Sequence, residues 1–145
     1  MIAVLGANGM AGHIIAKFLL SVGCRVTTVA RHTSDISVNF EIKSDIDDLV
    51  ETIKISEIKF VINCVGLLVQ DSINQPDRAI ILNSWLPLYL EHEFKNTDVR
   101  IIHISTDCIF DGMVGSYVES DAPTERNLYG MSKAMGEVSN DKDIT

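Results

Sequence analysis

The sequence predicts an α/β fold built on a doubly wound parallel sheet. Short apolar runs alternate along the 145 residues with longer segments of helical spacing, the order typical of parallel strands joined by right-handed crossovers. A glycine-rich turn from Gly6 to Gly12 follows the first apolar run directly. The run Phe60–Val65 is apolar almost throughout, as expected for a strand covered on both faces. Together these features indicate a Rossmann fold.

The strands and helices are expected in strict alternation. A helix should reach about Val22 after the glycine turn, and Asp45 is placed to cap the next one. Pro87 should kink the long helical stretch from Pro76 to about Phe94, or end a segment of it. A loop, Thr106 to Glu125, precedes the last helix. The strands are expected at Ile2–Leu5, Arg25–Val29, Ser37–Ile42, Phe60–Val65 and Val99–Ser105, and the later helices at Asp45–Ile55 and Asn127–Val138.

Composition and charge exclude several classes of protein. Hydrophobic residues make up 46% and charged residues 22%, which is globular composition. The net charge of -8 argues against general binding to nucleic acid or to an anionic membrane. No apolar run is long enough to span a bilayer. Cys24, Cys64 and Cys108 lie in apolar segments without metal-ligand or disulfide spacing, so we expect reduced thiols, no metal site and a cytoplasmic protein.

The glycine turn has the spacing expected of a nucleotide site. Glycines allow a tight turn, close approach of the backbone to a pyrophosphate, and tight packing of the following helix. The pyrophosphate would then lie on unpaired N–H groups at the helix N-terminus. The spacing is G-x-x-G-x-x-G, not the commonest dinucleotide pattern, and an ordinary strand–turn–helix is the alternative. The residues expected to bind the cofactor here are Gly6, Asn8, Gly9, Met10 and Gly12.

The end of the second strand favours NADP(H) over NAD(H). No acidic residue lies at its tip to bind the two ribose hydroxyls of NAD. Arg31, with His32 beside it, is placed to meet a 2′-phosphate. The alternatives are a solvated surface arginine and a preference for NAD(H).

A tyrosine and a lysine on the last helix are candidates for catalysis. Tyr129 and Lys133 are four residues apart, so both side chains lie on one helix face. A free tyrosine has a pKa of about 10, and a nearby ammonium stabilises its phenolate. Tyr129 could then protonate the oxygen formed when hydride reaches a carbonyl carbon, while Lys133 holds ribose hydroxyls of the cofactor. Ser105 and Thr106 end the fifth strand, where ligands bind in such sheets, and a hydroxyl there could bond the carbonyl.

These features resemble the extended short-chain dehydrogenase/reductase family over the whole chain. Phe60–Gly66 is similar to that family's fourth strand, and Asn83 to an asparagine of the next helix. Within the family, the stretch from Ser105 to Gly112 is most similar to the dTDP-4-dehydrorhamnose reductases. The same similarity continues in Tyr117, Glu119, Pro123, Tyr129, Gly130, Lys133, Gly136 and Glu137.

The resemblance implies residue roles. It implies Thr106, Tyr129 and Lys133 as the catalytic residues, and reduction by NADPH of the 4-keto group of a dTDP-linked deoxysugar for dTDP-rhamnose or cell-surface polysaccharide synthesis. Cys108 departs from the family, which often has an aromatic residue there. Cofactor contacts are implied for Cys64, Val65, Gly66, Ser105, Tyr129 and Lys133, and substrate contacts for Thr106, Asp107, Cys108 and Tyr129.

Other functions and the extent of the protein stay open at this point. The alternatives are another sugar-nucleotide reductase or epimerase of the family, and a non-catalytic regulatory subunit similar to that of methionine adenosyltransferase. The oligomeric state is undetermined, a homodimer being one option. We expect residues 1–145 to form one NAD(P)-binding domain. A further strand is expected to begin at Asp143–Thr145, with the substrate-binding portion outside this chain.

Overall fold

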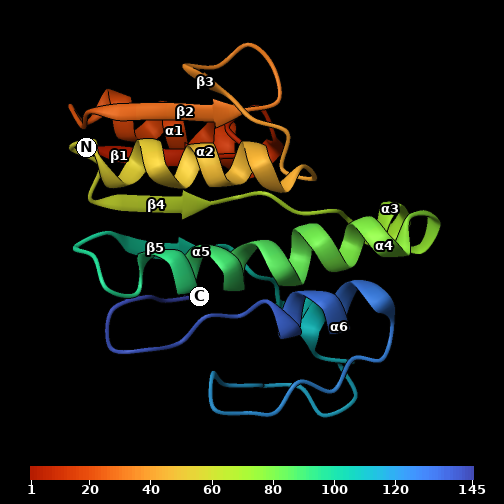
Figure 1. The fold of residues 1–145 in the computed structure, drawn as a ribbon. Helices are drawn as coiled ribbons and strands as arrows, with labels where there is room; N and C mark the ends of the chain where they lie inside the picture. Colours follow the sequence, from red (N-terminus) through yellow and green to blue (C-terminus); the bar gives the residue numbers. More distant parts are fainter.

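Five parallel strands form a single sheet in the computed structural model, which describes residues 1–145. The strand order is β3-β2-β1-β4-β5. The chain therefore runs outward from β1 to β3, then returns to the other side of β1, so the order reverses between β1 and β4. All carboxyl ends lie at one edge of the sheet, on the right in Figure 1. The strands are β1 (Ile2–Leu5), β2 (Val26–Ala30), β3 (Ile36–Ser37), β4 (Phe60–Asn63) and β5 (Arg100–His103).

Helices cover both faces of the sheet, as the sequence predicts. Helix α1 lies behind the sheet in Figure 1, and α2 lies in front of it. A nearly continuous helical segment, α3 to α5, leads from β4 to β5, and α6 packs against its middle. The helices are α1 (Met10–Ser21), α2 (Lys43–Lys54), α3 (Val69–Asn74), α4 (Pro76–Ala79), the π-helix η1 (Ile80–Trp85), α5 (Leu86–Phe94), the 3₁₀-helix η2 (Asp107–Ile109) and α6 (Leu128–Met135).

The hydrophobic core is larger on one face of the sheet than on the other. Because alternate residues of a strand face opposite ways, Ala3 and Leu5 of β1 join the larger cluster with α2 and α5, whereas Val4 joins the smaller one with Ala16 of α1. The larger cluster includes Ile46, Leu90 and Phe94, all completely buried. The doubly wound α/β fold is thus confirmed.

Two predictions near β3 are wrong. The strand expected at Ser37–Ile42 is only Ile36–Ser37. The Asn39 side chain accepts the Glu41 N–H at 3.1 Å, which bends the chain into a turn. Asp45 does not cap α2, because the helix begins earlier, at Lys43, and Asp45 lies in its first turn. Its carboxylate accepts the Asn39 N–H at 3.2 Å instead.

The prediction for Pro87 is confirmed, since a new helix, α5, begins just before it. In the first turn of a helix the missing N–H of proline leaves no bond unmade. Near Asp143, where a further strand is expected to begin, Ile144 forms an isolated parallel bridge with Ile102 of β5. None of the helices has the length and apolar character needed to cross a membrane.

Candidate active site

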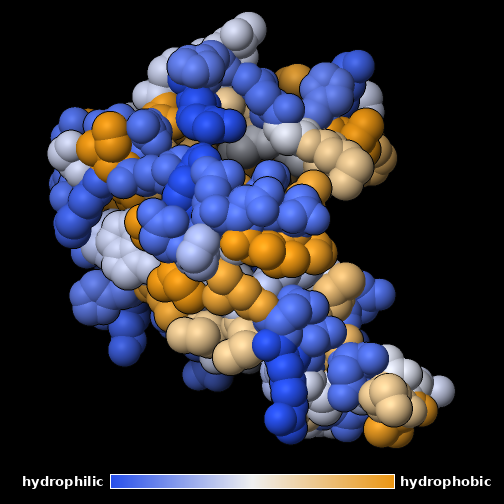
Figure 2. Space-filling view, turned by 90° about the vertical axis from the view of Figure 1, so that its right-hand side faces the viewer, coloured by the Kyte–Doolittle hydropathy of each residue, from blue (hydrophilic) through white to orange (hydrophobic).

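A cavity of about 290 Å³ opens at the carboxyl ends of β1, β2 and β4. This is the edge where the strand order reverses, the usual ligand position in doubly wound sheets. Figure 2 looks onto this edge and shows a hollowed face with apolar side chains gathered beside the hollow. Seven residues predicted to bind the cofactor line the cavity: Gly6, Asn8, Gly9, Arg31, Cys64, Val65 and Gly66.

Two glycines of the turn permit close packing that no other residue allows. Gly6 has φ +75°, and a Cβ there would lie 3.1 Å from the Cys64 carbonyl. A Cβ on Gly12 would lie 2.3 Å from the Gly6 carbonyl oxygen, far inside contact distance. The turn therefore folds back onto its own helix, which brings the start of α1 against β1. This close approach is the one predicted from the glycine spacing.

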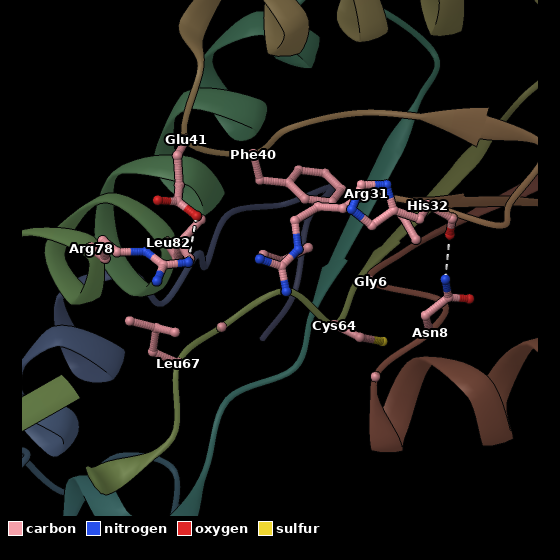
Figure 3. Close-up of a pocket in the computed structure, with 14 residues that line it drawn as sticks. Gly6, Asn8, Arg31, His32, Phe40, Glu41, Cys64, Leu67, Arg78 and Leu82 are labelled. Atoms are coloured by element: carbon pink, nitrogen blue, oxygen red, sulfur yellow. Dashed lines mark hydrogen bonds and ion pairs between the residues drawn. The ribbon is translucent and has the colours of Figure 1, made fainter. Parts of the chain in front are cut away.

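The N-terminus of α1 is open to a ligand. No side chain caps this helix, and Gly9 is its N-cap residue, so the first N–H groups have no partner within the helix. The Asn8 side chain donates to the His32 carbonyl and ties the turn to the end of β2 (Figure 3). Met10 is 83% exposed and, like Gly12, does not line the cavity.

Arg31 extends into the cavity from the end of β2 (Figure 3). It forms no ion pair, unlike Arg78, whose Nη2 lies 2.6 Å from Glu41 Oε1 across the same cavity. The Arg31 guanidinium is therefore free to meet an anion. Sequence reasoning missed Arg78, Glu41 and Phe40 as lining residues, because a short turn after β3 and a separate helix bring them there.

The end of β4 forms the opposite wall of the cavity. Cys64 and Val65 lie beside Gly6, as the Gly6 contacts show. Burial raises the pKa of the Cys64 thiol to about 11, against a smaller opposing effect of the Lys133 charge. The thiol is thus a protonated wall residue at neutral pH.

Tyr129 and Lys133 are both buried on α6, with 9% and 5% exposure. Lys133 Nζ donates to the Ile104 carbonyl at 2.6 Å and lies 3.2 Å from His103 Nε2. Burial lowers the pKa of Lys133 to about 8, partly offset by Glu137 and Cys64. The lysine therefore reaches the carboxyl end of β5 from the same helix face as the tyrosine.

Ser105 and Thr106 do not end the fifth strand as predicted, because β5 ends at His103, and they follow Ile104, the lysine contact, in the chain. Thr106 is the N-cap of η2, and its Oγ1 accepts the Cys108 N–H at 3.1 Å. Ser105 Oγ is buried without a hydrogen-bond partner. Asp107 and Cys108 are exposed and line a second, open hollow with Tyr117. None of the three predicted catalytic residues lines the cavity at the ends of β1, β2 and β4: Thr106, Tyr129 and Lys133.

Asn83 connects α6 with the wall formed after β4. Its Oδ1 accepts the Leu67 N–H at 2.8 Å, and its Nδ2 donates to Ser132 Oγ at 3.0 Å. Asn83 and Ser132 are completely buried. Sequence reasoning noted Asn83 but missed Ser132, Asn63 and His103, because polar residues inside apolar runs give no pattern of their own.

Comparison with known proteins assigns the family. The model of the RmlD substrate binding domain matches residues 1–144. The chain belongs to this family. The predicted resemblance to extended short-chain dehydrogenases/reductases, and within them to dTDP-4-dehydrorhamnose reductases, is thereby confirmed.

Two relatives match different lengths of the chain. A probable low-salt glycan biosynthesis reductase of Haloferax volcanii is 30% identical over 140 residues, covering 92% of this chain and 46% of the relative. Methionine adenosyltransferase 2 subunit beta of Pongo abelii is 42% identical over 64 residues, which is 44% of this chain and 19% of that protein.

Solved structures share the fold. A hypothetical dTDP-4-dehydrorhamnose reductase from Sulfolobus tokodaii superposes with a TM-score of 0.79 and 30% identity, over 93% of this chain and 50% of that one. A dTDP-4-dehydrorhamnose reductase from Bacillus anthracis, in complex with NADP, gives 0.78 at 22% identity, over 93% and 46%. The chain spans about half the length of these relatives.

Proposed function

We propose that this chain is the cofactor-binding part of an NADPH-dependent reductase that reduces the 4-keto group of a nucleotide-linked deoxysugar, as a dTDP-4-dehydrorhamnose reductase does. The observation that carries the proposal is the placement of α6. Its buried Tyr129 and Lys133 lie on one face, and Lys133 Nζ reaches the end of β5 through the Ile104 carbonyl. Two relatives at 30% identity that are named as reductases support the same reaction class.

The cavity suits a dinucleotide with a 2′-phosphate. The Gly6–Gly12 cradle excludes even a Cβ, so the backbone can approach a pyrophosphate closely. Arg31 is an unpaired cation at the end of β2, where the 2′-phosphate of NADP would lie. When bound, NADPH would supply the hydride. The NADP complex of the Bacillus anthracis structure supports this choice of cofactor.

The residues of α6 and β5 have separate roles in the proposal. Tyr129 donates a proton to the sugar oxygen as the carbonyl is reduced. Lys133 supplies a positive charge that favours the resulting phenolate, and it binds ribose hydroxyls. Thr106 offers a hydroxyl to the same oxygen from the start of η2, just after β5. Asp107 and Cys108, exposed beside it, would contact the sugar nucleotide.

The test is an absorbance assay of NADPH with dTDP-4-keto-6-deoxyhexose, run on the complete gene product. Tyr129→Phe should lower kcat about 100-fold or more, because it removes the proton donor. Tyr89→Phe is the matched control, since its hydroxyl bonds Asp47 on α2, away from the cavity. Equal rates in wild type and Tyr129→Phe would refute the catalytic assignment.

Cofactor choice has its own test. Arg31→Ala should weaken NADPH binding about tenfold and leave NADH binding unchanged, because one charge-assisted contact to the 2′-phosphate is lost. Arg25→Ala is the control, since this residue lies just before the amino end of the same strand in an exposed pair with Glu57. An equal loss for both cofactors would contradict the role given to Arg31.

A regulatory subunit is the second candidate. The observation in its favour is the similarity to methionine adenosyltransferase 2 subunit beta over 64 residues. Such a protein would bind NADPH with unchanged affinity in Tyr129→Phe and would turn over no keto-sugar. The same assay therefore separates the two candidates.

A further inference from the structure

A line of three buried polar side chains joins β4, β5 and α6, and none of the three lines the cavity. Asn63 is 0% exposed, His103 1% and Lys133 5%. Asn63 Nδ2 lies 3.1 Å from His103 Nδ1, and His103 Nε2 lies 3.2 Å from Lys133 Nζ. Only Lys133 has a role in the proposed reaction, so Asn63 and His103 are buried polar groups whose purpose is not yet explained.

The contact between Asn63 and the Val65 N–H determines which atoms donate and which accept in the hydrogen bonds from Asn63 to Lys133. The Val65 N–H donates to Asn63 Oδ1 at 3.1 Å, which requires that atom to be the amide oxygen. The Asn63 amide nitrogen therefore faces His103 Nδ1 and can only donate to it. A neutral imidazole has one N–H and one acceptor nitrogen. With Nδ1 as the acceptor, the proton of His103 lies on Nε2.

This tautomer directs an N–H at Lys133. An ammonium has three donors and no acceptor, so it cannot bond another N–H. An uncharged amine has a lone pair that can accept it. The second contact of Nζ, to the Ile104 carbonyl at 2.6 Å, uses an N–H of the amine. The observed positions thus match a neutral Lys133 between one donor and one acceptor.

We propose that His103, held by Asn63, is a positioning residue that stabilises the uncharged amine of Lys133 against β5 and so sets the pH at which this lysine becomes an ammonium. The ammonium would have to leave His103 Nε2, which frees it to face Tyr129 and the ribose. That last consequence rests on the proposed function; the tautomer and the lysine titration do not.

The surrounding charges agree with this assignment. Burial lowers the pKa of His103 to about 3, with a further lowering when Lys133 is charged and an opposing effect of the Asn63 backbone, so the ring stays neutral. Burial lowers the pKa of Lys133 to about 8. The other titratable groups that act on Lys133 are Glu137, just after the end of α6, and Cys64 after β4, and both raise its pKa. Neither supplies the N–H that faces Nζ.

The direct test is nitrogen-15 NMR of the histidines and carbon-13 NMR of the lysine Cε in the ligand-free protein. His103 should be the neutral Nε2–H tautomer from pH 5 to 9, because its pKa of about 3 lies about two units below this range. The Lys133 signal should titrate well below the other lysines. An Nδ1–H tautomer, or a Lys133 midpoint equal to that of exposed lysines, would overturn the proposal.

Asn63→Asp should reverse the direction of the hydrogen bonds from residue 63 through His103 to Lys133, while the side chain keeps nearly the same shape. The carboxylate still accepts the Val65 N–H, but it cannot donate to His103. The ring proton should therefore move to Nδ1, which donates to the carboxylate, and Nε2 becomes an acceptor. The Lys133 midpoint should rise by about one pH unit or more; His92→Gln, on the surface, should leave it unchanged. A folded Asn63→Asp protein with the wild-type midpoint would refute the proposal, and the wild-type tautomer decides it if this variant does not fold. Absence of NADPH turnover with these NMR results intact would refute the proposed function alone.

Discussion

Gly12→Ala is the sharpest perturbation of the cofactor cradle. A Cβ at this position would lie 2.3 Å from the Gly6 carbonyl oxygen and 2.8 Å from the Gly6 carbonyl carbon. Both atoms belong to the backbone, so neither can swing away as a flexible side chain would. The start of α1 or the Gly6 turn must shift instead, and the turn is the predicted pyrophosphate site.

The expected magnitude follows from this geometry. Overpacking by one methyl group costs about 1–3 kcal/mol. For a domain of this size each kcal/mol lowers Tm by roughly 2–4 °C, so a loss of about 2–12 °C is expected. The shift of the first-turn N–H groups should also weaken NADPH binding by about tenfold or more, a difference of ~1.4 kcal/mol.

Thermal unfolding by circular dichroism and calorimetric titration with NADPH measure the two effects. Ala11→Ser is the matched control, since Ala11 is exposed in the same helical turn and surface substitutions change stability by only about 0.5 kcal/mol. Wild-type Tm and wild-type NADPH affinity in Gly12→Ala would refute the close approach described here.

Two buried polar residues and two cysteines give three more predictions. Asn83→Ala should lower the free energy of unfolding in urea by about 1–3 kcal/mol, because the Leu67 N–H loses its partner; no change would contradict this. Burial lowers the pKa of His103 from 6.5 to about 3, so the unfolded chain binds its proton first as the pH falls. Wild type should therefore lose about 2 kcal/mol more than His103→Gln between pH 6.5 and 5 in urea titrations, and parallel curves would exclude this. Iodoacetamide at pH 8 should label exposed Cys108 before Cys64, whose pKa is raised to about 11, and the reverse order in mass spectra would be inconsistent with the structure.

The strands, the glycine turn and the Tyr129/Lys133 pair could be predicted from the sequence because each has a local pattern. Alternation of apolar runs predicts the sheet, and spacing alone places Tyr129 and Lys133 on one face. The wrong predictions arise where a side chain competes with the backbone. Asn39 ends β3 early by taking the Glu41 N–H, and Asp45 bonds a loop amide where a cap was expected.

The missed residues of the site have a different cause. Arg78 and Glu41 are 37 positions apart and meet only because α4 passes the turn after β3. Asn63 and His103 lie within apolar runs, and their partnership depends on β4 pairing with β5 in register, where they lie directly opposite. Such pairs form only in the tertiary structure, so no local sequence pattern predicts them.

The central claim is that NADPH binds at the carboxyl edge of this sheet, across β1, β2 and β4. Titration of nitrogen-15-labelled residues 1–145 with NADPH tests it most directly. Saturable shifts should concentrate at the amides of Gly6 to Gly12, Arg31 and Val65 to Leu67. Absence of saturable shifts, or shifts confined to the amino ends of the strands, would contradict the account.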